Sequence, residues 1–143
     1  MFDVISIGAA TIDVFVKSLQ FIVDNDLISL KNSSKNEINK SLICSGGGAT
    51  NSAVSFSRLG LKTACLSLVG DDYLSKYIYD DLKKESVSTN LLIKNKNDVT
   101  DFSVILVAQN GSRSVLVNRG VTRLEEKFFD WDKINKTKWF YIT

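Results

Sequence analysis

Three consecutive glycines, Gly46 to Gly48, form the part of the sequence best suited to holding a small ligand. Glycine carries no side chain, so the backbone can approach another molecule closely there. The residues that follow read as a helix of small residues that ends at Gly60. The start of a helix presents N–H groups without intrahelical partners and a partial positive charge. A glycine loop that leads into a helix therefore predicts a place where oxygen atoms of a small ligand are held.

Other kinds of chemistry are excluded by the residue types that the chain lacks. It contains no histidine, which excludes a Ser-His-Asp triad and argues against a zinc site. Cys44 and Cys65 stand alone in apolar runs, so we expect buried thiols rather than a disulfide or a metal pair. The 18 basic and 16 acidic side chains give a formal charge of +2, and the lysines are scattered. We therefore expect no metal ligands and no nucleic-acid partner.

The composition is that of an ordinary folded domain, with 143 residues of which 44% are hydrophobic and 24% charged. This length is enough for a domain with its own core. No apolar run approaches the ~20 residues of a membrane span. The N-terminus lacks the basic segment of a signal peptide. We expect a soluble, cytoplasmic protein with no membrane partner.

Strands and helices alternate along the chain and would position the glycine loop. The predicted elements, in order, are strands at 4–8, 11–16 and 41–44, a helix from the glycines to 60, a strand at 63–69, a helix at 73–85, and strands at 91–93, 102–108, 114–118 and 139–142. The alternation favours an α/β layer with a parallel sheet. Asn110-Gly111 is a strong hairpin signal. Together with extended pieces at 11–18 and 38–44, it predicts a second, antiparallel β element.

The predicted helix at 73–85 has a recognisable start and an apolar face. Asp71 or Asp72 is expected to cap its first turn, because aspartate accepts hydrogen bonds from the N–H groups there. Leu74, Tyr77, Ile78 and Leu82 fall on one side of the helix. We expect that side to belong to the core.

Taken together, five pieces of the sequence resemble the N-terminal portion of the ribokinase-like (PfkB-type) carbohydrate kinases. They are similar, in order, to the family's first strand with its following aspartate, its glycine–asparagine signature, its glycine–aspartate turn, its hairpin and the loop after it. The pieces are residues 8–13; Gly46-Gly47 with Asn51, Ala53 and Arg58-Leu59-Gly60; residues 69–73; residues 111–113; and residues 119–120. They cover nearly the whole chain but only about the first half of a family member. Leu74 and Ser86 stand where many relatives have glycine.

The resemblance implies a ribokinase-like fold, in which a doubly wound, mostly parallel α/β sheet carries a small β-sheet lid. Residues 1–143 would be the N-terminal part of one such domain, truncated after roughly half of it. Lid segments at about 11–44 and 100–120 would be inserted in the α/β body. In the family, pairs of lids often pack together, so the resemblance is compatible with a homodimer of the complete protein through the lid.

The family's members transfer the γ-phosphoryl group of ATP to a hydroxyl, usually of a sugar or a nucleoside. Carried over to this chain, the resemblance assigns Asp13 to hydroxyl groups of the substrate. It assigns Gly46 and Gly47 to the close approach of the backbone to the sugar, and Asn51 to a further hydroxyl. A carboxylate and a carboxamide together supply the acceptors and donors that a polyol requires.

The family's later motifs are missing. The chain contains no Gly-Ala-Gly-Asp, whose aspartate is the family's catalytic base, and no Asn-x-x-Glu, which is linked to magnesium. The ATP site of the family also lies in its second half. The resemblance thus implies that the complete enzyme uses ATP and Mg²⁺ and that its base lies beyond residue 143. Because phosphoryl transfer depends on positioning and charge stabilisation, we expect this chain alone to bind neither cofactor strongly and to be inactive.

Two alternatives stay open at the level of the sequence. The acceptor could be a nucleoside or another alcohol, since residues 14–44 and 100–120 show no decisive preference. The chain could also be a non-catalytic binding module that ends at Thr143.

Overall fold

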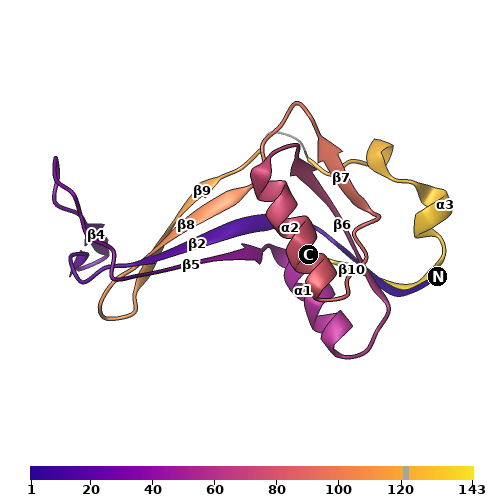
Figure 1. Cartoon of the computed structure of the whole chain (residues 1–143), viewed down its shortest axis with the longest axis horizontal. Coiled ribbons are helices and arrows are strands. Elements are labelled where there is room, and N and C mark those ends of the chain that lie inside the picture. The colour runs from indigo at the N-terminus through magenta and orange to yellow at the C-terminus, as the bar shows by residue number, and fades with distance from the viewer. Residues whose placement is uncertain (121–122) are drawn as a thin grey trace. The chain divides into compact units, whose positions relative to one another are not determined.

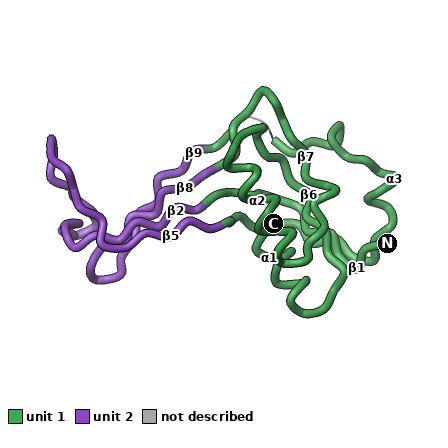
Figure 2. The backbone as a smooth tube through the Cα atoms, in the orientation of Figure 1, with its two compact units in different colours: residues 1–12, 45–101, 119–143 green, residues 13–44, 102–118 purple. Residues whose placement is uncertain are grey.

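The computed structural model describes residues 1–120 and 123–143, which divide into two compact units (Figure 2). The first unit consists of Met1–Ile12, Ser45–Asp101 and Arg119–Thr143. The second unit consists of Asp13–Cys44 and Phe102–Asn118. Each unit is thus assembled from separate stretches of sequence.

The first unit is built on a parallel sheet with the strand order β10-β1-β6-β7. Its strands are β1 (Phe2–Ile7), β6 (Thr63–Gly70), β7 (Leu92–Asn95) and β10 (Thr137–Ile142), and each neighbouring pair runs parallel. The chain adds β6 and β7 on one side of β1 and then returns to place β10 on the other side. The predicted α/β layer with a parallel sheet is confirmed.

Two helices, α1 (Gly48–Arg58) and α2 (Tyr73–Lys84), lie side by side on this sheet (Figure 1). They touch at their carboxyl ends, where the hydroxyl of Ser57 donates a hydrogen bond of 2.7 Å to the main-chain oxygen of Glu85. Helix α1 packs against β1 and β6. Gly60 follows it with a φ of +88°, in the left-handed conformation that ends a helix. Both predicted helices are confirmed within one or two residues.

The buried face of α2 is narrower than the sequence suggested. Ser75, Ile78 and Leu82 are fully buried, at spacings of three and four residues. Tyr77 is 43% exposed, so the prediction that it belongs to the core is wrong. The physical reason is its place at the margin of the buried stripe, about 100° around the helix from Ile78.

A short 3₁₀ turn (Glu126–Phe128) and the four-residue helix α3 (Trp131–Ile134) precede β10. Ile134 is buried in one cluster with Ile5 and Leu66. The sequence analysis did not predict these elements, because four helical residues are too few to show a hydrophobic period.

The second unit contains a four-stranded sheet in the order β5-β2-β8-β9 and a small two-stranded one. Its strands are β2 (Thr11–Lys17), β3 (Ile22–Asp24), β4 (Leu27–Ser29), β5 (Lys40–Gly46), β8 (Phe102–Val107) and β9 (Arg113–Asn118). Strands β8 and β9 are antiparallel, and Gly111 has a φ of +86° in the turn between them. The hairpin predicted from Asn110-Gly111 is confirmed.

The two cysteines differ in their surroundings. Cys65 is fully buried in β6, and burial raises the pKa of its thiol to about 12, so it is an inert core residue. Cys44 is only half-buried, and the prediction of a buried thiol is therefore too strong for it. In the residues that the structure describes, no helix has the length and apolar character needed to cross a membrane.

Candidate functional site

The glycine turn between β5 and α1 has a backbone conformation that few residues other than glycine adopt. Gly47 precedes the first helical residue with φ 94° and ψ 153°. A Cβ atom on Gly47 would lie 2.4 Å from the main-chain oxygen of Ala9, and one on Gly48 would lie 2.2 Å from Oγ1 of Thr143. These two glycines therefore allow close packing within the chain itself. Gly46 is buried at the end of β5.

The start of α1 is fixed against the loop that follows β1. The N–H group of Ala49 donates a hydrogen bond of 3.0 Å to the main-chain oxygen of Ala9. The hydroxyl of Thr50 donates a bond of 3.0 Å to the oxygen of Gly47 and a second one to that of Gly46. No side chain caps the helix, and its first turn carries no acidic residue. The glycine backbone is thus positioned by the main-chain bond to Ala9 and by the hydroxyl of Thr50.

Asn51 lies on the exposed side of α1, one turn into the helix. Its N–H group donates to the oxygen of Gly47 over 3.0 Å. Its side chain lines a polar cavity of about 410 Å³ together with Ser45, Val54, Ser55, Arg58, Asp81 and Glu85. The hydroxyl of Ser45 donates to the carboxylate of Asp81 in this cavity.

Asp13 is half-buried in β2 and is the first residue of the second unit. Its main-chain oxygen accepts a contact of 3.9 Å from the thiol of Cys44. Of the four residues that the sequence suggested for substrate binding, the first unit brings together Gly46, Gly47 and Asn51. Asp13 belongs to the other unit.

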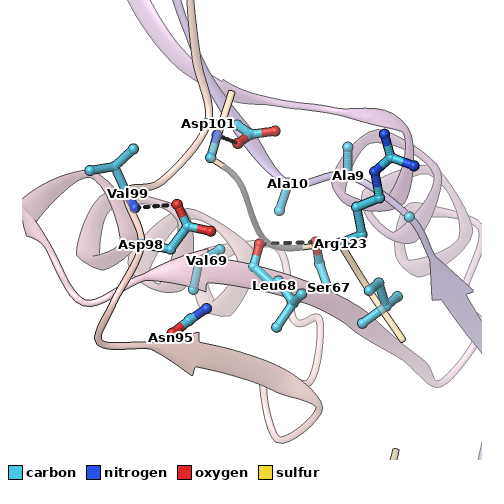
Figure 3. Close-up of a pocket in the computed structure, with 13 residues that line it drawn as sticks. Ala9, Ala10, Ser67, Leu68, Val69, Asn95, Asp98, Val99, Asp101 and Arg123 are labelled. Carbon is cyan, nitrogen blue, oxygen red and sulfur yellow. Dashed lines mark hydrogen bonds between the residues drawn. The ribbon is translucent and has the colours of Figure 1, made fainter. Parts of the chain in front are cut away.

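A second cavity, of about 220 Å³, opens at the carboxyl end of the first unit's sheet (Figure 3). In open α/β sheets, ligands bind beside this end of the strands. The lining residues come from the loop after β1, from β6, from the last residue of β7 and the loop after it, and from the segment that follows β9. They are Gly8, Ala9, Ala10, Ser67, Leu68, Val69, Asn95, Asp98, Val99, Asp101, Gly120, Arg123 and Leu124.

The glycine turn lies directly behind one wall of this cavity. A Cβ atom on Gly47 would approach both the oxygen of Ala9 and, at 3.1 Å, the Cα atom of Ala10, and both alanines line the cavity. The sequence analysis missed the polar side chains of the opposite side, among them Asn95 and Asp101. The available signal was their place between two predicted strands, where a parallel strand ends at the carboxyl edge of the sheet.

The loop that carries Asp101 is fixed by the cap of α2. The carboxylate of Asp72 accepts hydrogen bonds from the N–H of Ser75 at 2.9 Å and from the N–H and hydroxyl of Thr100 at 2.8 and 2.7 Å. Partial burial acts to raise the pKa of Asp72, but these bonds outweigh it and hold the pKa below its ordinary value. Of the two caps that the sequence allowed, the structure selects Asp72.

Comparison with known proteins identifies a family. The sequence profile of the pfkB family of carbohydrate kinases matches residues 1–143. An uncharacterized sugar kinase of Pyrococcus horikoshii is 30% identical over 115 residues, which are 79% of this chain and 37% of that protein.

Solved structures show the same fold. The ribokinase of Cryptococcus neoformans in complex with ADP matches with a TM-score of 0.73 at 21% identity, over 99% of this chain and 42% of that one. The Arabidopsis thaliana ribokinase complexed with ribose and ATP matches with a TM-score of 0.67 at 20% identity, over 83% of this chain and 36% of that one. The expected ribokinase-like α/β fold is confirmed. The chain spans less than half the length of each of these proteins.

Proposed function

Because the chain belongs to the pfkB family of carbohydrate kinases, we propose that it is the acceptor-binding portion of an ATP-dependent sugar kinase. The complete enzyme would transfer the γ-phosphoryl group of ATP to a sugar hydroxyl. One observation carries the proposal: the glycine turn before α1 is fixed on the loop after β1 by the bond from Ala49 to Ala9. From Ala9 the chain reaches Asp13 in four residues.

The proposal gives each residue of the set a role. The carboxylate of Asp13 accepts hydrogen bonds from hydroxyl groups of the acceptor, and the carboxamide of Asn51 binds a further hydroxyl. Gly46 and Gly47 present main-chain groups without side chains in the way. Under the proposal, the segments at about 11–44 and 100–120, which include the β sheet of the second unit, form the lid of the complete enzyme.

No residue of this chain is assigned to ATP or Mg²⁺. Within the described part of the chain, no three His, Cys, Asp or Glu side chains are grouped in a way that could hold a metal ion. Under the proposal, the nucleotide, the metal ion and the catalytic base are held by sequence that this chain does not contain. The similar Arabidopsis thaliana ribokinase forms a complex with ribose and ATP, which supports the expectation that the complete enzyme binds both a sugar and ATP.

Binding by the chain tests the acceptor site. Isothermal titration with ribose, fructose and adenosine is expected to show binding of a sugar that weakens about tenfold or more in Asp13→Ala and Asn51→Ala, because each loses a hydrogen bond to the ligand. Asp26→Ala, an exposed residue of the second unit, is the matched control. A preference for adenosine would favour a nucleoside acceptor. Binding that both variants leave unchanged would contradict the assigned residues.

A phosphotransfer assay tests whether the chain lacks the catalytic base, as we propose. The 143-residue chain with ATP, Mg²⁺ and each sugar is expected to give no turnover, since it carries no proposed base. Turnover by this chain alone would show that the base lies within residues 1–143.

A further inference from the structure

The cavity at the carboxyl end of the first unit's sheet is lined by an exposed arginine, Arg123, that the proposed function leaves unused. Arg123 lines it together with the loop after β1 (Figure 3). Arg123 forms no hydrogen bond or ion pair with any residue that the structure describes. Within the described part of the chain, none of its five donors is therefore used.

The two acidic residues of the cavity, Asp98 and Asp101, accept hydrogen bonds from main-chain N–H groups. The Oδ1 atom of Asp101 accepts a bond of 2.7 Å from the N–H group of Gly120. The Oδ1 atom of Asp98 accepts a bond of 2.9 Å from the N–H group of Val99. A Cβ atom on Gly120 would lie 2.6 Å from this Asp98 oxygen, so both carboxylates pack on the Gly120 turn. These contacts fix both carboxylates beside Gly120, and neither carboxylate forms an ion pair with Arg123.

Separate positive and negative groups in one small cavity fit a ligand that needs both. A carboxylate accepts hydrogen bonds from hydroxyl groups, whereas a guanidinium presents a planar fork that matches a carboxylate or a phosphate. Lysine would offer only a point charge in the same place. The cavity volume of about 220 Å³ limits the ligand to a small molecule, or to one end of it.

From this arrangement we propose that the acceptor of this kinase carries an anionic group, a carboxylate or a phosphate, in addition to its hydroxyls. Arg123 binds the anionic group, and Asp101 accepts a hydrogen bond from a hydroxyl. The inference rests on the proposed function and narrows its substrate class from sugars in general to acidic sugars.

Three ligands that share a six-carbon polyol skeleton test it: glucose, gluconate and glucose 6-phosphate, titrated calorimetrically into the 143-residue chain. We expect gluconate or glucose 6-phosphate to bind at least about tenfold more tightly than glucose, as expected for one charge-assisted hydrogen-bonded pair. The two anions distinguish a sugar acid from a sugar phosphate. The preference is expected to decrease as the salt concentration rises.

Variants of Arg123 test whether its guanidinium group causes the preference for anionic ligands. Arg123→Gln should remove the preference for the anion, and Arg123→Lys should retain part of it. Arg119→Gln is the matched control, because Arg119 is an exposed arginine of the same segment that does not line the cavity. Inorganic phosphate should bind at least tenfold more weakly than the preferred acidic sugar.

Each remaining outcome counts against the proposal in a distinguishable way. Equal binding of glucose and the two anions, or an anion preference that Arg123→Gln retains, would overturn the acidic substrate class and leave the proposed sugar kinase standing. Inorganic phosphate that binds as tightly as the sugars would identify a simple anion site and overturn the inference. If neither these ligands nor the ribose, fructose and adenosine of the first titration bind, the proposed function fails and the inference with it.

Discussion

Helices α1 and α2 lie side by side on one sheet and end in the same way, but they begin differently (Figure 1). The start of α2 is capped by a side chain, because the carboxylate of Asp72 accepts hydrogen bonds from the N–H groups of Ser75 and Thr100. The start of α1 has a glycine where α2 has this carboxylate, and no side chain caps it.

The two helix starts are therefore fixed by different groups, that of α2 by a side chain and that of α1 by its contact with the loop after β1. Capping of α2 contributes to the stability of the fold and fixes the loop that carries Asp101. In α1, main-chain contacts to Ala9 provide the positioning, and the partial positive charge of the helix start is not neutralised by an acidic side chain. The comparison predicts that substitutions at the two starts act through different physical causes.

Gly47→Ala should have the largest effect. Its φ and ψ lie in a region that is nearly exclusive to glycine, and the added Cβ would lie 2.4 Å from the oxygen of Ala9. We expect the free energy of unfolding to fall by about 3 kcal/mol, measured by urea denaturation. Gly60→Ala is the matched control, since its φ is +88° but nothing lies within 4 Å of an added Cβ, and should cost about 1–2 kcal/mol. Equal losses would show that backbone conformation alone decides both sites.

Asp72→Ala should have the next largest effect on the free energy of unfolding. It removes the cap of α2 and leaves the buried hydroxyl of Thr100 without that acceptor, so we expect a loss of about 2–3 kcal/mol in the same denaturation experiment. The neighbouring Asp71 pairs with Lys94 on the surface, and Asp71→Ala should have a much smaller effect. A loss at Asp71 that matches the loss at Asp72 would contradict the assigned cap.

The contribution of Asp72 should also depend on pH. Its pKa in the folded chain is lowered, so its carboxylate stabilises the fold above the unfolded-state pKa of about 3.9, and this stability is lost as the pH falls through the folded value. The difference in unfolding free energy between the chain and Asp72→Asn should therefore be constant above about pH 5 and shrink below pH 4. A difference that grows on acidification would reverse the sign of the pKa shift.

Ser86→Gly should have the smallest effect, and the opposite sign. Ser86 has a φ of +60°, donates its N–H to the oxygen of Lys83 at 3.0 Å, and stands just after α2. Gly60 occupies the equivalent place after α1. We expect Ser86→Gly to raise the melting temperature, with a gain in stability of about 0.5–1 kcal/mol, and Gly60→Ser to lower it. A decrease for Ser86→Gly would mean that its side chain contributes more than the strain costs.

The elements that the sequence predicted well are those with a local signal. The apolar run of β6, the Asn110-Gly111 turn and the glycine after α1 each determine their conformation within a few residues. Helix α3 is too short for such a signal, and Tyr77 has the spacing of a core residue but lies at the margin of the buried stripe.

The candidate site likewise has a part that the sequence predicted and a part that it did not. The glycine turn was evident from Gly46 to Gly48, because three consecutive glycines predict an unusual backbone conformation without information from distant residues. The cavity beside it was not evident, because its walls bring Ala9 together with Asp101 and Arg123, which both lie more than ninety positions later in the chain. No periodicity or motif links these residues.

By itself, the sequence of this chain determined its longer strands, helices α1 and α2, its glycine turn and its likeness to a family of carbohydrate kinases. These features depend on neighbouring residues and on motifs in order. The tertiary structure alone decided that Asp72 rather than Asp71 caps α2 and that Arg123 lines the same cavity as the loop after β1. The physical reason is that both depend on which distant segments the parallel sheet brings to its carboxyl edge.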